Sequence, residues 1–168
     1  MDFTRKHGVG FVYHMECYSP DGKLLWQTRE ENILPNEGRD YLMNAGLNVG
    51  AQFGSWFIGL YEGNYGPVAA DTMATFPASA TEITAYSETA RVALVDEPLA
   101  SGLWANSVTK AQFTFTATKT VRGAFISSGS VKGGTTGVLL SAVLASSPKT
   151  VNNGEILQVV AGLSLVTL

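Results

Sequence analysis

The run SVTKAQFTFTAT, residues 107–118, opens the stretch that decides the fold of this chain. Its residues Ala111, Phe113, Phe115 and Ala117 fall on one parity and alternate with glutamine and threonine. A period of two residues is typical of a strand with one buried face. The run therefore predicts a half-buried β-strand over 107–118.

The rest of this stretch contains further apolar runs of strand length. They are separated by KGGTTG (132–137) and NNG (152–154), which hold residues that tolerate the positive φ of tight turns. The extended segments predicted here are 121–127, 138–145, 148–154 and 155–168. Together they predict the core of an antiparallel β-sandwich.

The first part of the chain predicts a β-hairpin. Residues 11–18 and 23–29 flank SPDG (19–22), in which proline presets φ and Asp-Gly closes the turn. The residues that share one face of the first strand are Phe11, Tyr13, Met15 and Cys17. Before this hairpin, residues 1–10 are polar, and we expect them to form a flexible arm on a single β-sandwich domain of residues 11–168.

One helix is predicted, over residues 37–45. Asn36 is its expected N-cap, and Glu37 lies in the first turn, where the helix dipole favours an acidic residue. Gly46 is expected to end it. Strands are predicted at 55–61, with apolar residues on both parities and hence both faces covered, and at 89–95.

Residues 62–87 have no stable hydrophobic period, apart from one possible helical turn at 71–76. A long irregular segment in a compact domain is usually functional or ordered by a partner. Tyrosine and tryptophan are enriched at protein interfaces, and the aromatic residues in or beside this segment are therefore interface candidates. The full set of candidates is Phe3, Arg5, Tyr61, Tyr65, Pro67, Phe76, Tyr86 and Trp104. The alternative is that the aromatic side chains simply cover the sandwich.

The composition argues against nucleic acid or a membrane as a binding partner. The 168 residues carry a net charge of −3, with 45% apolar and only 15% charged residues. There is no basic run of the kind that binds phosphates, and no apolar window of about 20 residues, so neither nucleic acid nor membrane is an expected partner. A surface poor in charge is often covered by another protein.

No motif predicts catalysis, a cofactor or a metal. Cys17 is the single cysteine, which excludes an intrachain disulfide and a cysteine-based metal cluster. His14 shares its strand face with Glu16, but a metal site needs more ligands than these. The carboxylates are scattered and are interpreted as solvated turn residues, although the separation in space that defines an acid and base pair is not readable from sequence.

Several short segments resemble the capsid decoration (cement) proteins of tailed bacteriophages. They are NILPNEGRDYL (32–42), WFIGLY (56–61), PVAADT (67–72), YSETAR (86–91), the strands with Phe125 and 138–144, and Asn153-Gly154. The resemblance implies a jelly-roll-like sandwich that binds the outside of an assembled head, often as a homotrimer. The implied partners are the major capsid protein and further copies of the chain, and the implied location is the virion surface after synthesis in the host cytoplasm.

From these points we expect a structural protein rather than an enzyme, in which the arm of residues 1–10 and the 62–87 segment reach onto neighbouring subunits. Two alternatives stay open. One is a tail or fibre-associated virion protein. The other is a carbohydrate-binding module in which Trp56, Trp104 and Tyr61 stack on sugars.

Overall fold

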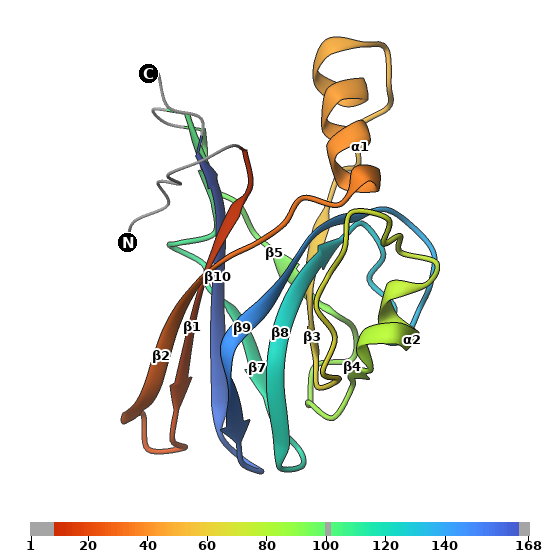
Figure 1. Ribbon diagram of the computed structural model, residues 1–168. Coiled ribbons are helices and arrows are strands. Elements are labelled where there is room, and N and C mark those ends of the chain that lie inside the picture. The colour runs from red at the N-terminus through yellow and green to blue at the C-terminus, as the bar shows by residue number, and fades with distance from the viewer. Residues whose placement is uncertain (1–8, 100–101, 165–168) are drawn as a thin grey trace.

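The structure is a computed structural model that describes residues 9–99 and 102–164. The chain forms two antiparallel five-stranded sheets that face one another, which confirms the predicted mainly-β sandwich (Figure 1). The jelly-roll form of its connections stays a prediction. The prediction of an N-terminal arm falls mostly on residues 1–8, which lie outside the described residues.

The first sheet has the strand order β2-β1-β10-β6, and β7 also pairs with β10. Its strands are β1 (Phe11–Tyr18), β2 (Leu24–Glu31), β6 (Leu103–Ala105), β7 (Ala111–Thr114) and β10 (Ile156–Ser164). The predicted hairpin of β1 and β2 is confirmed, and β1 also pairs along its whole length with β10. The beginning and the end of the described chain therefore lie side by side in one sheet.

The second sheet has the order β4-β3-β8-β9, and β5 also pairs with β3. Its strands are β3 (Trp56–Tyr61), β4 (Glu82–Ile83), β5 (Val92–Leu94), β8 (Lys119–Ser127) and β9 (Leu139–Val151). The segments predicted separately at 138–145 and 148–154 are one edge strand, β9. Its register shifts between the pairs Gly123↔Leu144 and Val121↔Lys149, and this irregularity accommodates Pro148, which cannot donate to the ladder.

The hydrophobic core lies between the two sheets. The predicted buried face of β1 is confirmed, because its four alternating residues from Phe11 to Cys17 are at most 1% exposed. They meet Ile58 and Leu60 of β3 and Ile126 of β8. Each such side chain contributes about 1.5–3 kcal/mol when it is fully buried.

A second apolar cluster lies on the outer face of the second sheet. Tyr61 and Phe125 of the sheet are covered by Met73 and Phe76, which come from the segment that the sequence left irregular. That segment contains α2 (Phe76–Ala80), and the helical turn predicted at 71–76 precedes it, where the Thr72 carbonyl accepts the N–H groups of Thr75 (3.1 Å) and Phe76 (2.9 Å). Both faces of β3 are thus covered, as its apolar pattern predicted.

The two sheets are tied together at both sides of the sandwich. Ile33 forms a bridge with Ala142 at one side, and Tyr86 forms one with Phe115 at the other. Phe115 therefore lies beyond β7, which is shorter than the strand predicted over 107–118 because the chain there turns to join the other sheet.

The long helix α1 (Asn36–Leu47) confirms the predicted helix and extends past it in both directions. Pro35, not Asn36, occupies the N-cap position, and Gly46 lies within the helix, which ends at Leu47 with Asn48 as its C-cap. Within residues 9–99 and 102–164, neither helix is long and apolar enough to cross a membrane.

Candidate functional site

Helix α1 stands out from one end of the sandwich and is attached by its first turn (Figure 1). The N–H of Asn36 donates to the Ala69 carbonyl at 2.8 Å. The Glu37 carboxylate accepts the N–H groups of Met73 (2.8 Å) and Leu139 (2.6 Å). Glu37 was predicted to lie where the helix dipole favours an acidic residue. Its carboxylate also fixes the helix to β9 and to residues 62–81, which we call the cover segment because Met73 and Phe76 within it cover the outer face of the second sheet.

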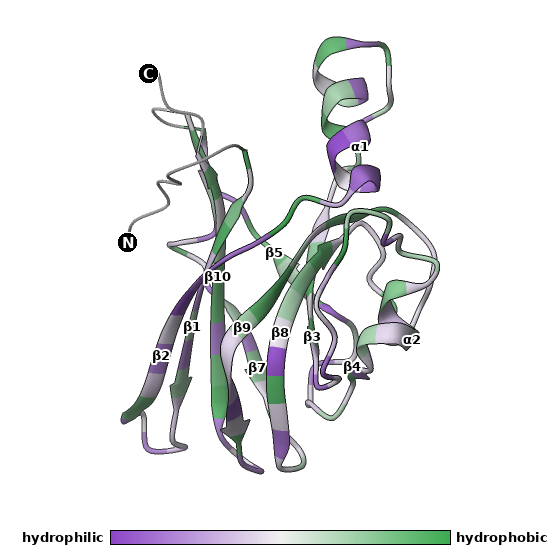
Figure 2. Cartoon of the chain, in the orientation of Figure 1, coloured by the Kyte–Doolittle hydropathy of each residue, from purple (hydrophilic) through white to green (hydrophobic). Residues whose placement is uncertain are grey.

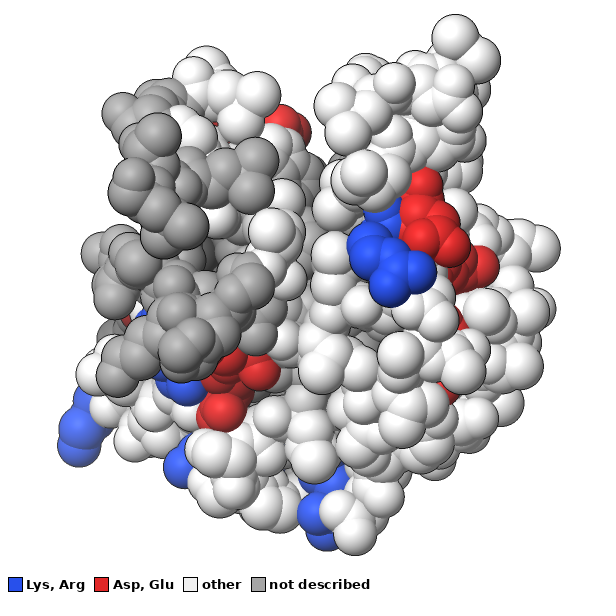
Figure 3. All heavy atoms as spheres, turned by 45° about the horizontal axis from the view of Figure 1, so that its top comes forward, with Lys and Arg blue, Asp and Glu red and all other residues white. Residues whose placement is uncertain are grey.

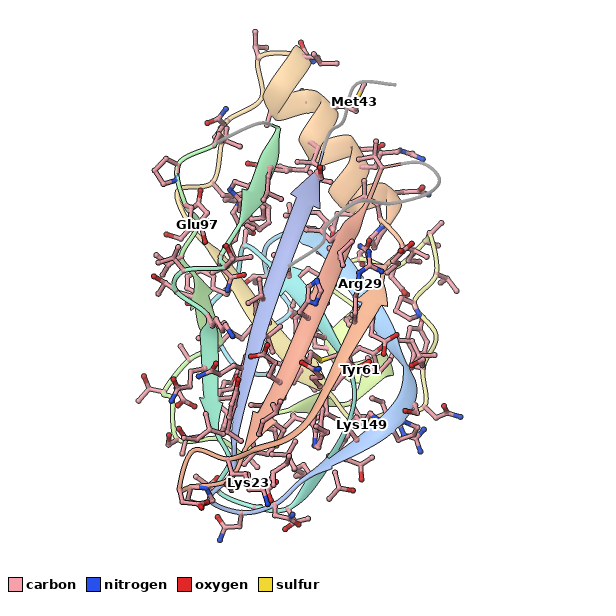
Figure 4. The ribbon with its side chains drawn as sticks, turned by 90° about the vertical axis from the view of Figure 1, so that its left-hand side faces the viewer. Lys23, Arg29, Met43, Tyr61, Glu97 and Lys149 are labelled. Atoms are coloured by element: carbon pink, nitrogen blue, oxygen red, sulfur yellow. The ribbon has the colours of Figure 1, made fainter. Side chains whose placement is uncertain are left out.

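The outer part of α1 carries apolar side chains that are largely exposed within the described part of the chain. Met43 is 55% exposed and Leu47 is 79% exposed, and Val49 just beyond the helix is 95% exposed. Met43 and Leu47 are four residues apart and so share one side of the helix. Figure 2 shows a hydrophilic base of α1 and apolar residues further out, and Figure 4 shows Met43 at the opposite end of the molecule from Lys23.

The other side of α1 faces an aromatic cluster. Tyr41 of the helix stacks on Phe53 with ring centroids 5.2 Å apart, and both rings lie edge-on to Trp56 at 5.1 Å and 5.7 Å. The Tyr41 hydroxyl also accepts the N–H of Phe53 at 2.9 Å. These contacts hold the 48–55 loop against α1 and hold α1 in place beside β3.

A hollow of about 660 Å³ opens at this end between α1 and the ends of the two sheets. Its lining includes Tyr41, Leu42, Phe53, Trp56, Leu99 and Trp104. The Trp104 indole N–H donates to the Asp96 carboxylate at 2.8 Å, which leaves the ring as an apolar wall. On the rim, Leu99 is 75% exposed and Val95 is 49% exposed.

This end of the molecule is almost free of charge. Residues 41–61 contain no Asp, Glu, Lys, Arg or His. Asp96 is the one charged side chain among the described residues that line the hollow. Figure 3 shows the projecting part of α1 without acidic or basic residues, which gather at its base. The groups present offer apolar contact area and few hydrogen bonds, which suits a protein surface.

We call this region the α1 end. It consists of the projecting side of α1 (Met43 and Leu47), the tip at residues 48–52, and the hollow with its rim at Val95 and Leu99.

Three of the predicted interface residues are not at the surface. Tyr61 and Phe76 are 0% exposed and Tyr86 is 3% exposed. Phe76 lies edge-on between Tyr61 (5.6 Å) and Phe125 (5.4 Å), and Tyr86 lies edge-on to Phe113 (5.1 Å). For these three residues the interface prediction is wrong, and the alternative, that they cover the sandwich, describes them.

The other predicted residues have different positions. Trp104 lines the hollow. Tyr65 and Pro67 are partly exposed on the cover segment, where the Tyr65 hydroxyl donates to Asp71 at 2.6 Å. Phe3 and Arg5 lie outside the described residues.

For Met73 and Phe76 the prediction that residues 62–87 reach out to a neighbour is wrong, whereas for Val68, which is 50% exposed in the same segment, it stays a prediction. Met73 and Phe76 are 0% exposed because they pack onto the chain's own second sheet. Sequence reasoning instead missed Met43, Leu47, Val49 and Phe53. One signal in the sequence could have indicated them. The predicted helix has apolar residues on two sides, Leu42 and Ala45 on one and Met43 and Leu47 on the other, and this pattern is typical of a helix that packs against protein on both sides.

A smaller hollow of about 310 Å³ lies on the outer face of the first sheet, lined by His14, Glu16, Gln27, Thr28 and Arg29. Burial alone would raise the pKa of Glu16, but hydrogen bonds from Lys110 (2.6 Å) and Tyr18 (2.8 Å) outweigh this and lower it. The cationic side chains of Lys110 and Arg29 therefore lie beside Glu16, where a metal ion would have to bind. No group of three or more possible His, Cys, Asp or Glu ligands occurs in the described part of the chain.

Neither a family model nor a curated protein matches this sequence. The α1 end is therefore the feature from which we infer a function.

Proposed function

We propose that this protein is a structural virion protein that binds the outer surface of a tailed-bacteriophage capsid and stabilises the head. The observation that carries the proposal is the α1 end, an uncharged apolar projection fixed to a rigid β-sandwich. Such a surface acts by burying area against another protein. The segments that resemble capsid decoration proteins supply the class of partner.

The size of the apolar surface supports adhesion to a protein. Its exposed residues are Met43, Leu47, Val49, Phe53, Val95 and Leu99, which are between 43% and 95% exposed. Together they expose on the order of several hundred Å² of apolar surface, distributed over both sides of α1, and exposed apolar surface of this extent often marks an interaction site. A standard interface buries about 800 Å² per partner, so this end can supply much of one.

The parts of the α1 end differ in position, and we assign the contact with the capsid to one of them. The tip, with Val49, extends furthest from the sandwich and is suited to contact the major capsid protein. A shell presents many identical binding sites, and association of the copies as a homotrimer would convert weak contacts into tight holding through avidity. The proposed location is accordingly the capsid surface, and the proposal includes no nucleic acid and no membrane.

A change at the tip tests the proposal. We expect Val49→Asp to weaken binding to purified capsids that lack this protein by roughly tenfold or more, because burial of one such side chain contributes about 1.5–3 kcal/mol. Co-sedimentation of the protein with the capsids measures the affinity. The matched control is Val108→Asp, since Val108 is 81% exposed on the loop before β7, away from the tip.

Two outcomes would reject the proposal. Wild-type protein that fails to bind heads at any concentration removes the function, and electron microscopy that places the protein on tails favours the tail-associated alternative. Equal binding by Val49→Asp and Val108→Asp would remove the tip as the contact while leaving the decoration role in place.

The carbohydrate-binding alternative is favoured by one observation, the aromatic lining of the hollow. Trp56 and Trp104 both line it, but Tyr61 is fully buried and takes no part. Trp56 is also engaged edge-on by two neighbouring rings, which leaves less of its face for a sugar. A glycan array separates the two functions, and we expect no binding there.

A further inference from the structure

We propose that the hollow of one molecule receives the projecting side of α1, with Met43 and Leu47, from a second copy of this chain. The copies then associate head to tail. This inference rests on the proposed function and deepens it, because it names the occupant of the hollow and the way in which copies are held beside one another.

The lining of the hollow selects an apolar, uncharged occupant. Apart from Gln52, Ser55 and Asp96, the described side chains around it are aromatic or aliphatic. Asp96 is the one charged group among them, and its carboxylate already accepts a hydrogen bond from Trp104. Phosphate groups would need cationic partners, which the lining lacks. A volume of about 660 Å³ lies in the range of pockets that enclose a drug-sized ligand, so it has room for several aliphatic side chains.

The chain itself carries a projection of that character. Met43 and Leu47 are 55% and 79% exposed, and no charged residue occurs between residues 41 and 61. They lie on the side of α1 that faces away from the hollow, because the helix residues that line it are Tyr41, Leu42, Ala45 and Gly46. Projection and hollow are thus on opposite sides of one helix.

This placement gives the contact a direction. When Met43 and Leu47 of one copy enter the hollow of the next, the first copy's own hollow stays open for a third. Two different surfaces of the chain are paired, which makes the contact heterologous, and such contacts close into a ring when the rotation between neighbours permits it.

The helix itself would gain from the contact. At 12 residues α1 has about the length at which an isolated helix is marginal in water, and the hydrogen bonds and ring contacts that hold it on the sandwich come from its first half, between Asn36 and Leu42. Packing of its outer side against a neighbour covers the part that is least supported within the molecule. A ring of copies also points several tips at one shell, as decoration requires.

The mass of the full-length protein in solution tests the inference. We expect sedimentation velocity to show a mass that rises with concentration to a multiple of 17.9 kDa. The projection variant Met43→Lys/Leu47→Lys and the rim variant Val95→Lys/Leu99→Lys change exposed residues, so both should fold. Each is expected to remain a monomer, whereas the control Leu24→Lys/Val131→Lys, which changes exposed residues outside the α1 end, should assemble like the wild type.

Mixing the two variants gives the decisive result. The rim variant keeps its projection and the projection variant keeps its hollow, so an equimolar mixture can form one contact and should stop at two copies. A wild-type protein that stays monomeric at its highest soluble concentration overturns the inference. So does a mixture that stays monomeric, or a projection variant that assembles normally.

Capsid binding, measured in parallel, separates this inference from the proposed function. A wild-type monomer that binds capsids would reject the head-to-tail contact alone. A wild-type protein that assembles but does not bind capsids would reject the decoration role alone.

Discussion

At the scale of single residues, the most consequential group is the buried ion pair of Arg91 and Glu82. Their side chains are 0% and 2% exposed, and the guanidinium donates to both carboxylate oxygens, at 2.8 Å and 2.7 Å. It also donates to the carbonyls of Gly129 (2.9 Å) and Gly134 (2.7 Å). Arg91 thus fixes the connection between β8 and β9 to β4.

We expect Arg91→Ala to lower the free energy of unfolding by about 3–5 kcal/mol, because it leaves the Glu82 carboxylate buried without its partner. Arg39→Ala is the matched control, since Arg39 pairs with Asp40 at the surface, where such pairs contribute about 1 kcal/mol or less. Urea denaturation measures both variants. Equal losses for Arg91→Ala and Arg39→Ala would contradict the structural role given to Arg91.

Glu97 gives a prediction about pH. Hydrogen bonds from the Val108 N–H and the Ser107 hydroxyl lower the pKa of its carboxyl in the folded protein. A lowered folded pKa means that the stabilisation is complete above the unfolded value of about 4.3 and is lost as the pH falls through the folded pKa. We therefore expect stability to fall less steeply below about pH 4.3 in Glu97→Gln than in the wild type.

The measurement is a set of denaturation midpoints across that pH range. Asp40→Asn is a suitable control, because Asp40 is an exposed carboxylate in a surface ion pair. Superimposable pH profiles for the wild type and Glu97→Gln would show that the Glu97 hydrogen bonds do not contribute to acid stability.

Neither of these roles could be predicted from the sequence. The interpretation of the carboxylates as solvated turn residues fails for Glu82, whose partner is nine residues away across a turn and a short strand. Nothing in the local pattern around Arg91 distinguishes a buried arginine from an exposed one, because burial depends on the sheet that the residue meets.

At the scale of elements, α1 shows how tertiary contact reverses a local preference. Gly38 is buried where the helix crosses β9, and the space that a Cβ would occupy is taken by the Leu140 carbonyl. Gly46 belongs to the same helix, yet a Cβ there would meet nothing within 4 Å. The two glycines therefore differ only in what surrounds them.

Alanine at these two positions should have opposite effects. We expect Gly46→Ala to stabilise the protein by up to about 1 kcal/mol, the helix preference of alanine over glycine. Gly38→Ala should destabilise it by about 1–3 kcal/mol, because the helix must move away from β9. Thermal unfolding of both variants gives the two signs, and a stabilised Gly38→Ala would refute the close packing of α1 on β9.

The cover segment shows where sequence patterns stop being informative. Met73, Phe76 and Ala80 stand at i, i+3 and i+7, a helical spacing that spans only two turns, and the surface that buries them is the outer face of the second sheet, which the chain forms far away at β8 and β9. In contrast, β1 could be predicted with its correct bounds, since Phe11, Tyr13, Met15 and Cys17 alternate on one parity, and only the burial of Val12 on the other face departs from that pattern.

At the scale of the whole molecule, the sandwich was predictable and the candidate site was not. Alternating strands and turn residues report which side of each strand meets a core. They do not report which apolar residues are left over once the sheets have packed. Met43 and Leu47 become recognisable as a surface only when α1 is seen to leave the sandwich (Figure 4).

The position of Cys17 has a practical consequence for locating the protein on a particle. Its thiol is fully buried, and burial, with the neighbouring Glu155 carboxylate, raises its pKa to about 12, so it stays protonated and unreactive at neutral pH. It is also the only cysteine in the sequence. A cysteine introduced at any exposed position would be the sole site for maleimide dyes or gold clusters, which makes the native thiol no obstacle to site-specific imaging.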